Sequence, residues 1–207
     1  YFTRKDEFLR LALRAKNGPR KLLKNLWVTT FINFFPIRGS KYLFGSELVN
    51  KINQFFILDR LKKYIHDLNL INPILFISTA YAEPLLKYFP DSLKIYHCSD
   101  DYTVISNFPQ SFIEIEKKLI KNCNLVVTTA DELMKAKTKS NKNIISIPNG
   151  VDVFHFSKII NNDTVISKEM RNFSKPIIGY VGSIFQWIDI DWIAFAANEL
   201  PDHDFVF

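Results

Sequence analysis

Two short segments of the sequence carry residue types suited to chemistry. His97, Asp100 and Asp101 follow one short apolar run, and Gly179 and Gly182 close another. Parallel α/β sheets bind ligands at the carboxyl ends of their strands, so residues directly after a strand are the first candidates for a site. Glycines lack a Cβ and let backbone N–H groups approach a phosphate. The sequence therefore predicts one site of side chains and one of backbone amides.

Two other interpretations of residues 97–102 stay open at this point. Ser99 or Asp100 is suited to the N-cap of a helix that begins near Val104, where a carboxylate also complements the helix dipole. The histidine, cysteine and paired carboxylates of the same segment also resemble a metal site. The first interpretation is structural, and the second would make the segment a metal centre.

The elements that position these residues alternate between strand and helix. Apolar runs rich in β-branched residues predict strands at 26–31, 74–77, 94–97, 125–129, 144–147, 177–181 and 205–207. Helical periodicity predicts helices at 5–16, 49–68, 81–88, about 104–121, 131–136 and 189–200. Strands without strict alternation that are separated by helices indicate a parallel sheet covered on both faces. The predicted fold class is α/β, with doubly wound, Rossmann-like sheets.

A polar, poorly periodic stretch separates the last strands from the others and predicts two domains. We expect a Rossmann-like domain over 1–155 that lacks its first strand, a linker over 156–173, and the start of a second domain over 174–207. The chain begins with Tyr1 and ends in a strand-like apolar run. Both ends are therefore expected to be cut, and the second domain to be truncated.

A proline and a glycine interrupt the segment Ile144–Asp152. Pro148 has no N–H to donate and ends the strand ladder, and Gly150 permits a positive φ where the chain crosses between domains. Lys175–Ile184 repeats the arrangement, because its apolar strand also runs into glycines. Together the two segments predict two nucleotide-type sheets that meet at this crossing.

This pairing of segments resembles the interdomain crossing of retaining, nucleotide-sugar-dependent glycosyltransferases of the GT-B fold, glycosyltransferase family 4 in particular. Residues 185–191 and Pro201-Asp202 are similar to members of the teichuronic acid biosynthesis type. The resemblance implies transfer of a hexose from a nucleotide diphosphate sugar to a cell-envelope polysaccharide or a lipid-linked acceptor, with retention. The nucleotide sugar is then a substrate, and neither a cofactor nor a metal is required. The family residues that hold the ribose would lie beyond Phe207, so the fragment itself is expected to be inactive.

The resemblance also implies roles for individual residues. The catalytic role falls on His97, whose imidazole would accept a hydrogen bond from the donor sugar beside the reacting carbon. The residues implied for the acceptor side of the cleft are Asp100, Asp101 and Thr129. The residues implied for the donor phosphates are Gly182, Ser183 and Ile184. The residues implied for the interdomain crossing are Asn149, Gly150 and Asp152.

The order of the glycines in the sequence bears on functions other than glycosyl transfer. The glycines near residue 180 do not follow the Gly-x-Gly-x-x-Gly order of dinucleotide enzymes, which disfavours a dehydrogenase. A nucleotide-sugar epimerase of the same fold and a non-catalytic Rossmann-like binding module are the two alternatives that stay open.

Charge is distributed unevenly along the chain. The formal net charge is +6, but residues 1–63 hold 14 Lys/Arg against 4 Asp/Glu, and the remainder holds 13 against 17. Such asymmetry favours an anionic partner, either membrane headgroups or nucleic acid, whereas a solvated helix face is the structural alternative. Because no nucleic-acid reading motif accompanies the basic block, we expect an anionic membrane surface.

The remaining composition bears on the cellular compartment. No apolar run approaches the roughly 20 residues that cross a bilayer. Cys98 and Cys123 are the only cysteines, without a Cys-x-x-Cys pair, so neither a disulfide framework nor a structural zinc is indicated. We expect a cytoplasmic protein that is peripheral on the inner face of the cell membrane.

Overall fold

The chain forms two compact units in the computed structural model, which describes residues 12–33, 35, 47–105, 108–160, 164–185 and 187–207. The units are Tyr1–Asn149 and Gly150–Phe207. The division falls a few residues before the predicted linker, and the second unit includes α5 (Val153–Ser157) and the 3-10 helix η2 (Met170–Asn172).

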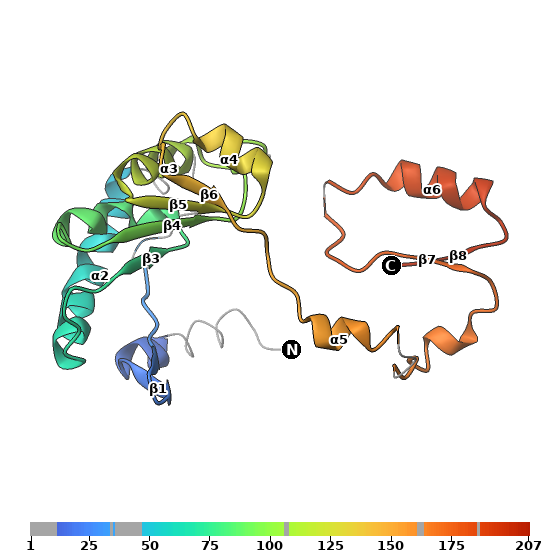
Figure 1. Ribbon diagram of the computed structural model, residues 1–207, viewed down its shortest axis with the longest axis horizontal. Coiled ribbons are helices and arrows are strands. Elements are labelled where there is room, and N and C mark those ends of the chain that lie inside the picture. The colour runs from blue at the N-terminus through green and yellow to red at the C-terminus, as the bar shows by residue number, and fades with distance from the viewer. Residues whose placement is uncertain (1–11, 34, 36–46, 106–107, 161–163, 186) are drawn as a thin grey trace. The chain divides into compact units, whose positions relative to one another are not determined.

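A parallel sheet of four strands forms the centre of the first unit (Figure 1). Its strands, in hydrogen-bonded order, are β3 (Leu75–Ile77), β4 (Lys94–Cys98), β5 (Leu125–Thr128) and β6 (Ile144–Ser146). The elements that connect them are the 3-10 helix η1 (Ala80–Tyr88), α3 (Gln110–Asn122) and α4 (Asp131–Lys137). This α/β arrangement confirms the predicted class and is compatible with a Rossmann-like domain.

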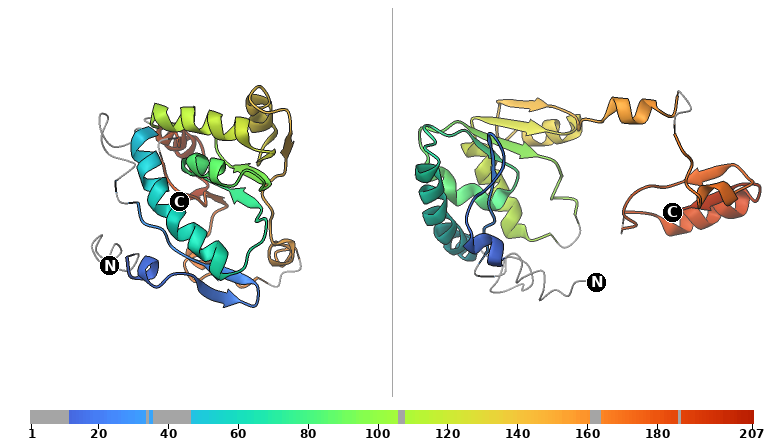
Figure 2. Two further views of the ribbon diagram at one scale, coloured as in Figure 1. Left: turned by 90° about the vertical axis from the view of Figure 1, so that its left-hand side faces the viewer. Right: turned by 90° about the horizontal axis from the view of Figure 1, so that it is seen from below.

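The core of the first unit lies on one face of this sheet. Alternation along β4 turns Tyr96 and Cys98 to the helix side, where they are almost completely buried. The cluster consists of Ile77, Ala80, Leu86, Tyr96, Cys98, Phe112, Ile115, Leu119, Ile120, Cys123, Val126 and Leu133. Figure 2 shows η1 and α3 along the same side of the strands.

The opposite face of the sheet is partly exposed among the described residues, although Val127 at its centre is buried. Phe76 and Ile145 point to it and are 65% and 41% exposed. The strand order follows the chain, so right-handed crossovers place every connecting element on one face. The prediction that helices cover both faces is therefore wrong for the part of the chain that the structure describes.

The helices of the first unit lie close to their predicted bounds, except that α3 begins later than predicted. α2 spans Glu47–Asp67, and the predicted helix at 81–88 is the 3-10 helix η1, which contains Pro84. α3 begins at Gln110 rather than near Val104, so neither Ser99 nor Asp100 is its N-cap. Pro109 occupies the N-cap position, and a proline disfavours helical φ and ψ angles in the residue before it.

An antiparallel hairpin precedes α2. Its strands are β1 (Arg20–Leu23) and β2 (Leu26–Val28), so the predicted strand at 26–31 is shorter and lies outside the parallel sheet. Residues 12–16 are helical, as predicted, while the rest of the predicted N-terminal helix lies outside the described residues.

The second unit has fewer strands and helices than the first. β7 (Ile177–Gly179) and β8 (Asp204–Val206) form a parallel pair, connected by α6 (Ile190–Glu199). Asp189 caps α6, since its carboxylate accepts a hydrogen bond from the backbone N–H of Trp192 at 3.0 Å. None of the described residues of this unit is buried.

Candidate functional site

The loop after β4 brings the predicted carboxylates to the carboxyl end of the parallel sheet. Thr129, at the end of β5, donates a hydrogen bond from Oγ1 to the carbonyl oxygen of Ser99 at 3.1 Å and so joins the two strand ends. Asp100 Oδ2 accepts a hydrogen bond from Ser99 Oγ at 2.8 Å. The structure therefore places Asp100, Asp101 and Thr129 around one strand-end edge.

Asp101 closes a tight turn in this loop. Its Oδ1 accepts hydrogen bonds from the backbone N–H of Thr103 at 3.1 Å and from Thr103 Oγ1 at 2.6 Å. Partial burial raises the pKa of Asp101, but the Thr103 hydrogen bonds and the nearby Lys137 ammonium together outweigh it and lower the pKa below its usual value. The carboxylate is thus ionised at neutral pH and can accept hydrogen bonds from hydroxyl groups.

His97 lies within β4 rather than after it, and its side chain points to the open face of the sheet. The half-buried imidazole stacks on Phe76, with ring centroids 5.8 Å apart and an interplanar angle of 26°. It makes no hydrogen bond to any other residue that the structure describes. Its ring nitrogens are therefore available to a ligand above this face.

A buried ionic network lies on the other side of β4. Glu116 of α3 accepts a hydrogen bond from the Tyr96 hydroxyl at 2.8 Å and pairs with Lys137 Nζ at 2.8 Å. The Cys98 thiol donates to the same carboxylate at 3.7 Å. Lys137 also approaches Asp101 Oδ1 to 3.8 Å, so α4 links the buried network to the loop of the predicted site.

Burial shifts the ionisation of the groups in this network. Desolvation, reinforced by the negative charge of Glu116, raises the pKa of the Cys98 thiol to about 11. The same two causes raise the pKa of Tyr96 far above its usual range. Both groups are protonated at neutral pH and act as hydrogen-bond donors to Glu116. Burial and the raised pKa of Cys98 disfavour its reaction as a nucleophile.

The residues of the predicted crossing are exposed. Asp152 caps α5, because its Oδ1 accepts a hydrogen bond from the backbone N–H of His155 at 2.9 Å. Gly150 does not adopt a positive φ, and a Cβ at this position would meet no atom within 4 Å. The positive φ that glycine permits is therefore not used at this position. Asn149 is the last residue of the first unit.

The loop after β7 has the character predicted for an amide site. Gly182, Ser183 and Ile184 are exposed, and their backbone N–H groups donate no hydrogen bond to any described residue. Tyr180 folds over this loop and donates from its hydroxyl to the carbonyl oxygen of Ser183 at 3.1 Å. A Cβ on Gly182 would lie 2.6 Å from that hydroxyl, so glycine leaves room for the tyrosine.

An apolar depression of about 390 Å³ lies beside this loop in the second unit. Trp187, Trp192 and Phe207 contribute aromatic surface, and Asp189 supplies the single charged group of the lining. Residues 176–207 contain no Lys or Arg, so within this segment only backbone amides can meet a negative charge.

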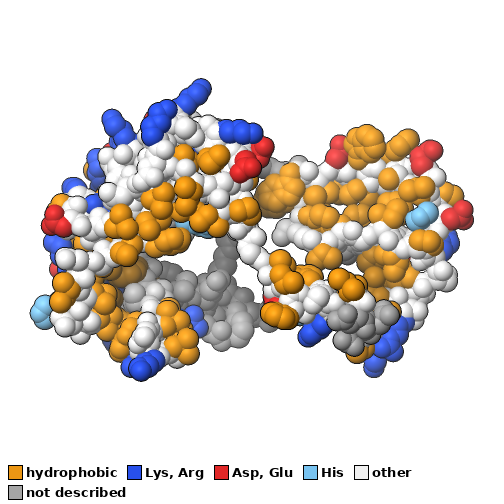
Figure 3. Space-filling model, in the orientation of Figure 1, with side chains coloured by type: hydrophobic (Ala, Val, Ile, Leu, Met, Phe, Trp, Pro, Cys, Tyr) orange, Lys and Arg blue, Asp and Glu red, His pale blue; other side chains and the backbone are white. Residues whose placement is uncertain are grey.

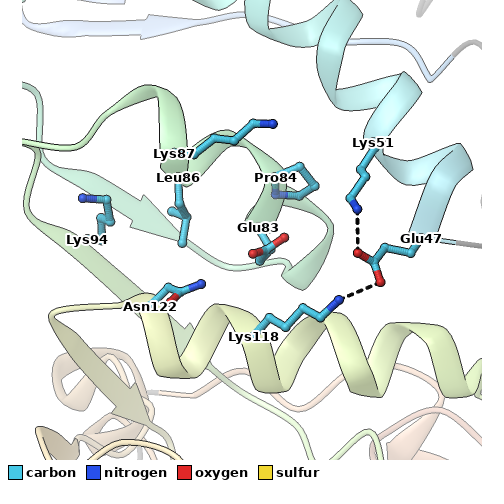
Figure 4. Close-up of a pocket in the computed structure, with 9 residues that line it drawn as sticks. All are labelled: Glu47, Lys51, Glu83, Pro84, Leu86, Lys87, Lys94, Lys118 and Asn122. Atoms are coloured by element: carbon cyan, nitrogen blue, oxygen red, sulfur yellow. Dashed lines mark hydrogen bonds and ion pairs between the residues drawn. The ribbon is translucent and has the colours of Figure 1, made fainter.

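A second cavity, of about 520 Å³, lies away from the predicted site, near the amino end of β4 (Figure 4). Glu47 of α2 bridges two lysines there, accepting from Lys118 Nζ at 2.7 Å and from Lys51 Nζ at 2.8 Å. These hydrogen bonds lower the pKa of Glu47 to about 2. Because the lysines are already paired, we place the candidate site at the strand ends instead.

Sequence reasoning missed the Tyr96–Glu116–Lys137 network. One signal was present, since Glu116 interrupts the apolar stripe of α3 that Phe112, Leu119 and their neighbours form. A carboxylate in a buried stripe requires a partner. Nothing local in the sequence identifies Lys137, 21 residues away, as that partner.

Comparison with known proteins adds no relative, since the chain matches neither a protein-family model nor a curated protein. Among the described residues, no group of three or more His, Cys, Asp and Glu side chains is placed to hold a metal ion. None of the helices that the structure describes is long and apolar enough to cross a membrane.

Proposed function

We propose that this protein is a glycosyltransferase of the GT-B type that moves a sugar from a nucleotide diphosphate donor to a cell-envelope polysaccharide or a lipid-linked acceptor, with retention. The observation that carries the proposal is the loop after β7, where three exposed backbone N–H groups have no partner among the described residues. Amides at the end of a strand in an α/β unit suit the phosphates of such a donor.

The second unit would bind the donor. The amides of Gly182, Ser183 and Ile184 donate to the diphosphate, and the nearby aromatic depression offers a surface against which the flat base of a nucleotide can stack. Since residues 176–207 lack Lys and Arg, this segment binds by hydrogen bonding rather than by neutralising the charge.

The first unit would bind the sugar and the acceptor. His97 offers a ring nitrogen as an acceptor to a sugar hydroxyl, while its stacking on Phe76 fixes the plane of the ring. Asp100 and Asp101 accept hydrogen bonds from acceptor hydroxyls at the strand-end edge. The lowered pKa of Asp101 keeps this carboxylate available at neutral pH.

Direct assay of transfer tests the proposal. A longer chain that carries the complete donor-binding domain after residue 207 is incubated with a panel of UDP-, GDP- and dTDP-linked sugars and with membrane lipid or glycan acceptors. Labelled product is measured with and without EDTA. Transfer that persists in EDTA is the expected result. Epimerised nucleotide sugar without transfer would instead support the epimerase, and no turnover of any donor would overturn the proposal.

Two pairs of variants then test the assigned roles. His97→Ala should lower kcat on the order of 10²-fold, whereas His66→Ala, on the exposed end of α2, should leave kcat unchanged. Ser183→Pro removes one amide donor and should raise the KM for the donor about 10-fold, while Ser183→Ala keeps that amide and should have a smaller effect. Equal effects within either pair would remove that residue from the site.

A further inference from the structure

The β1–β2 hairpin exposes an unusual amount of apolar surface. Leu23 and Leu26 face each other across the turn and are 67% and 45% exposed. Trp27 is exposed as well, and so are Leu22 and Val28. Among the described elements, the contacts of the hairpin are chiefly between its own two strands. A two-stranded hairpin is at best marginally stable alone in water, so this surface is suited to burial against a partner.

The base of the hairpin is anchored, whereas its turn projects freely. Arg60 of α2 donates a hydrogen bond to the carbonyl oxygen of Ala15, which is buried, at 3.4 Å. On the other side of the hairpin, Phe31 lies against Tyr64 of α2, with ring centroids 6.0 Å apart. Two anchors at the base of an exposed turn present the apolar tip in a fixed direction.

Positive charge surrounds this apolar tip. Residues 12–35 contain no Asp or Glu, and their basic residues are Arg14, Lys16, Arg20, Lys21 and Lys24. Lys21 Nζ lies 5.5 Å from the centre of the Trp27 ring. Figure 3 shows apolar and basic side chains side by side at this end of the first unit. Charge complementarity therefore selects an anionic partner.

From these observations we infer that the β1–β2 hairpin docks on an anionic lipid bilayer. Leucine and tryptophan side chains of the tip enter the interface between headgroups and acyl chains, where Trp is favoured. The flanking Arg20, Lys21 and Lys24 remain at the level of the lipid phosphates. A duplex nucleic acid would use the same charges but would leave Leu23 and Leu26 exposed to water. The docking surface is separate from the candidate site, so it does not depend on glycosyl transfer.

Vesicle flotation with the full chain tests the charge. Binding is expected to phosphatidylcholine vesicles that contain phosphatidylglycerol, and not to pure phosphatidylcholine vesicles. Changing Arg20, Lys21 and Lys24 to Gln should lower the partition coefficient on the order of 100-fold, and added salt should weaken binding by the wild type. The matched control changes Lys121, Lys139 and Lys142 to Gln, because these exposed lysines lie elsewhere in the same unit.

Fluorescence tests insertion of the tip. Trp187→Phe and Trp192→Phe leave Trp27 as the only tryptophan of the chain. Its emission should shift to the blue on anionic vesicles and be quenched by brominated lipid. Leu23→Asn with Leu26→Asn should lower vesicle binding about 10-fold or more, while circular dichroism shows an unchanged fold.

Three outcomes would overturn the inference. The first is that the control lysines matter as much as those of the hairpin. The second is that Trp27 emission stays unchanged on bound vesicles. The third is that the protein ignores anionic vesicles and retains duplex DNA under the same conditions.

Discussion

The two units use the same kind of parallel strands but differ in what those strands can bury. In the first unit, four strands and a layer of helices enclose twelve core residues, with Ala80, Cys98, Leu119 and Val126 fully inaccessible. In the second unit, two strands and one main helix leave Trp187, Trp192 and Phe195 more than half exposed. Apolar composition is similar, so the number of strands and layers decides which unit has a core.

This contrast gives the two units different roles. The first has a stable core, and the second exposes groups that can bind a ligand. The first unit can hold His97 and the acidic loop in fixed positions, because β4 is paired on both edges and backed by α3. The second unit offers exposed amides and aromatic rings on a scaffold without a described core. A ligand that binds the folded form of this unit is expected to stabilise it.

Hydrogen exchange should show the largest difference between the units. Amides of β5 are expected to exchange only through global unfolding, whereas those of β7 and β8 should exchange through local opening. If the first unit is stable by about 5 kcal/mol, the protection factors should differ on the order of 10³-fold or more. Mass spectrometry of peptides that cover Leu125–Thr128 and Ile177–Gly179 measures this. Equal protection of the two strands would contradict the comparison.

The next largest effect is expected at the buried ion pair of the first unit. Lys137→Met leaves the Glu116 carboxylate buried without its cation, which should lower the free energy of unfolding by about 3 to 5 kcal/mol. Glu116→Leu combined with Lys137→Met should recover part of this loss, because the unpaired charge is then gone while the buried Tyr96 hydroxyl loses its acceptor. Lys135→Met, on the exposed side of α4, serves as the control and should change stability by less than about 0.5 kcal/mol.

Urea denaturation of these variants gives the values. A Lys137→Met variant as stable as the wild type would show that Glu116 reaches water or is protonated. In that case the network would not hold the loop of the candidate site.

The strands and helices that follow from local apolar patterns in the sequence were predicted well. The strands β4, β5 and β6 coincide with apolar, β-branched runs to within one residue, and α2 to within two. β1 was missed because Arg20 and Lys21 are not typical of a strand, and its pairing with β2 depends on contact across a turn. The open face of the sheet follows from strand order, which no local pattern encodes.

Contacts between side chains far apart in the sequence are the second feature that sequence analysis could not predict. The residues at strand ends could be predicted from their position after apolar runs, as with Asp101 and Thr129. The inward-facing Asn50 and Asn53 of α2 bond to the backbone of Tyr81 and Phe35, which only the folded arrangement brings near. For the same reason, the orientation of His97 toward the open face required the register of β4.

Thiol reactivity should also distinguish the units. Burial raises the pKa of both Cys98 and Cys123 to about 11, which lowers their thiolate fraction near pH 8 about 100-fold relative to unperturbed thiols. Alkylation of the folded wild type is expected to be slow. In a Ser183→Cys variant, only the new, exposed thiol should react quickly, and labelling is followed by mass spectrometry. Fast labelling of Cys98 would contradict the buried network.

The same shifts predict alkaline destabilisation of the first unit. Thiols of the unfolded chain ionise near the ordinary cysteine pKa of 9.0, whereas the folded thiols keep their protons up to about 11. The folded state therefore binds more protons in this window, and the contribution to stability is complete below pH 9 and lost as the pH rises toward 11. Urea denaturation at about pH 7 and about pH 10 checks the sign. The double variant Cys98→Ala with Cys123→Ala should show a weaker pH dependence.

The smallest effects are expected at two glycines, one inside the first unit and one at the boundary between units. Gly18 has a φ of +72°, and a Cβ there would lie 3.6 Å from the Tyr64 hydroxyl. Gly18→Ala should therefore destabilise the first unit by about 1 kcal/mol, because an L-residue is strained in this region. Gly150 has neither a positive φ nor a close neighbour, so Gly150→Ala should change stability by less than about 0.5 kcal/mol. Thermal unfolding of both variants measures the difference, and a larger loss at Gly150 would show that the boundary needs a backbone conformation that only glycine adopts.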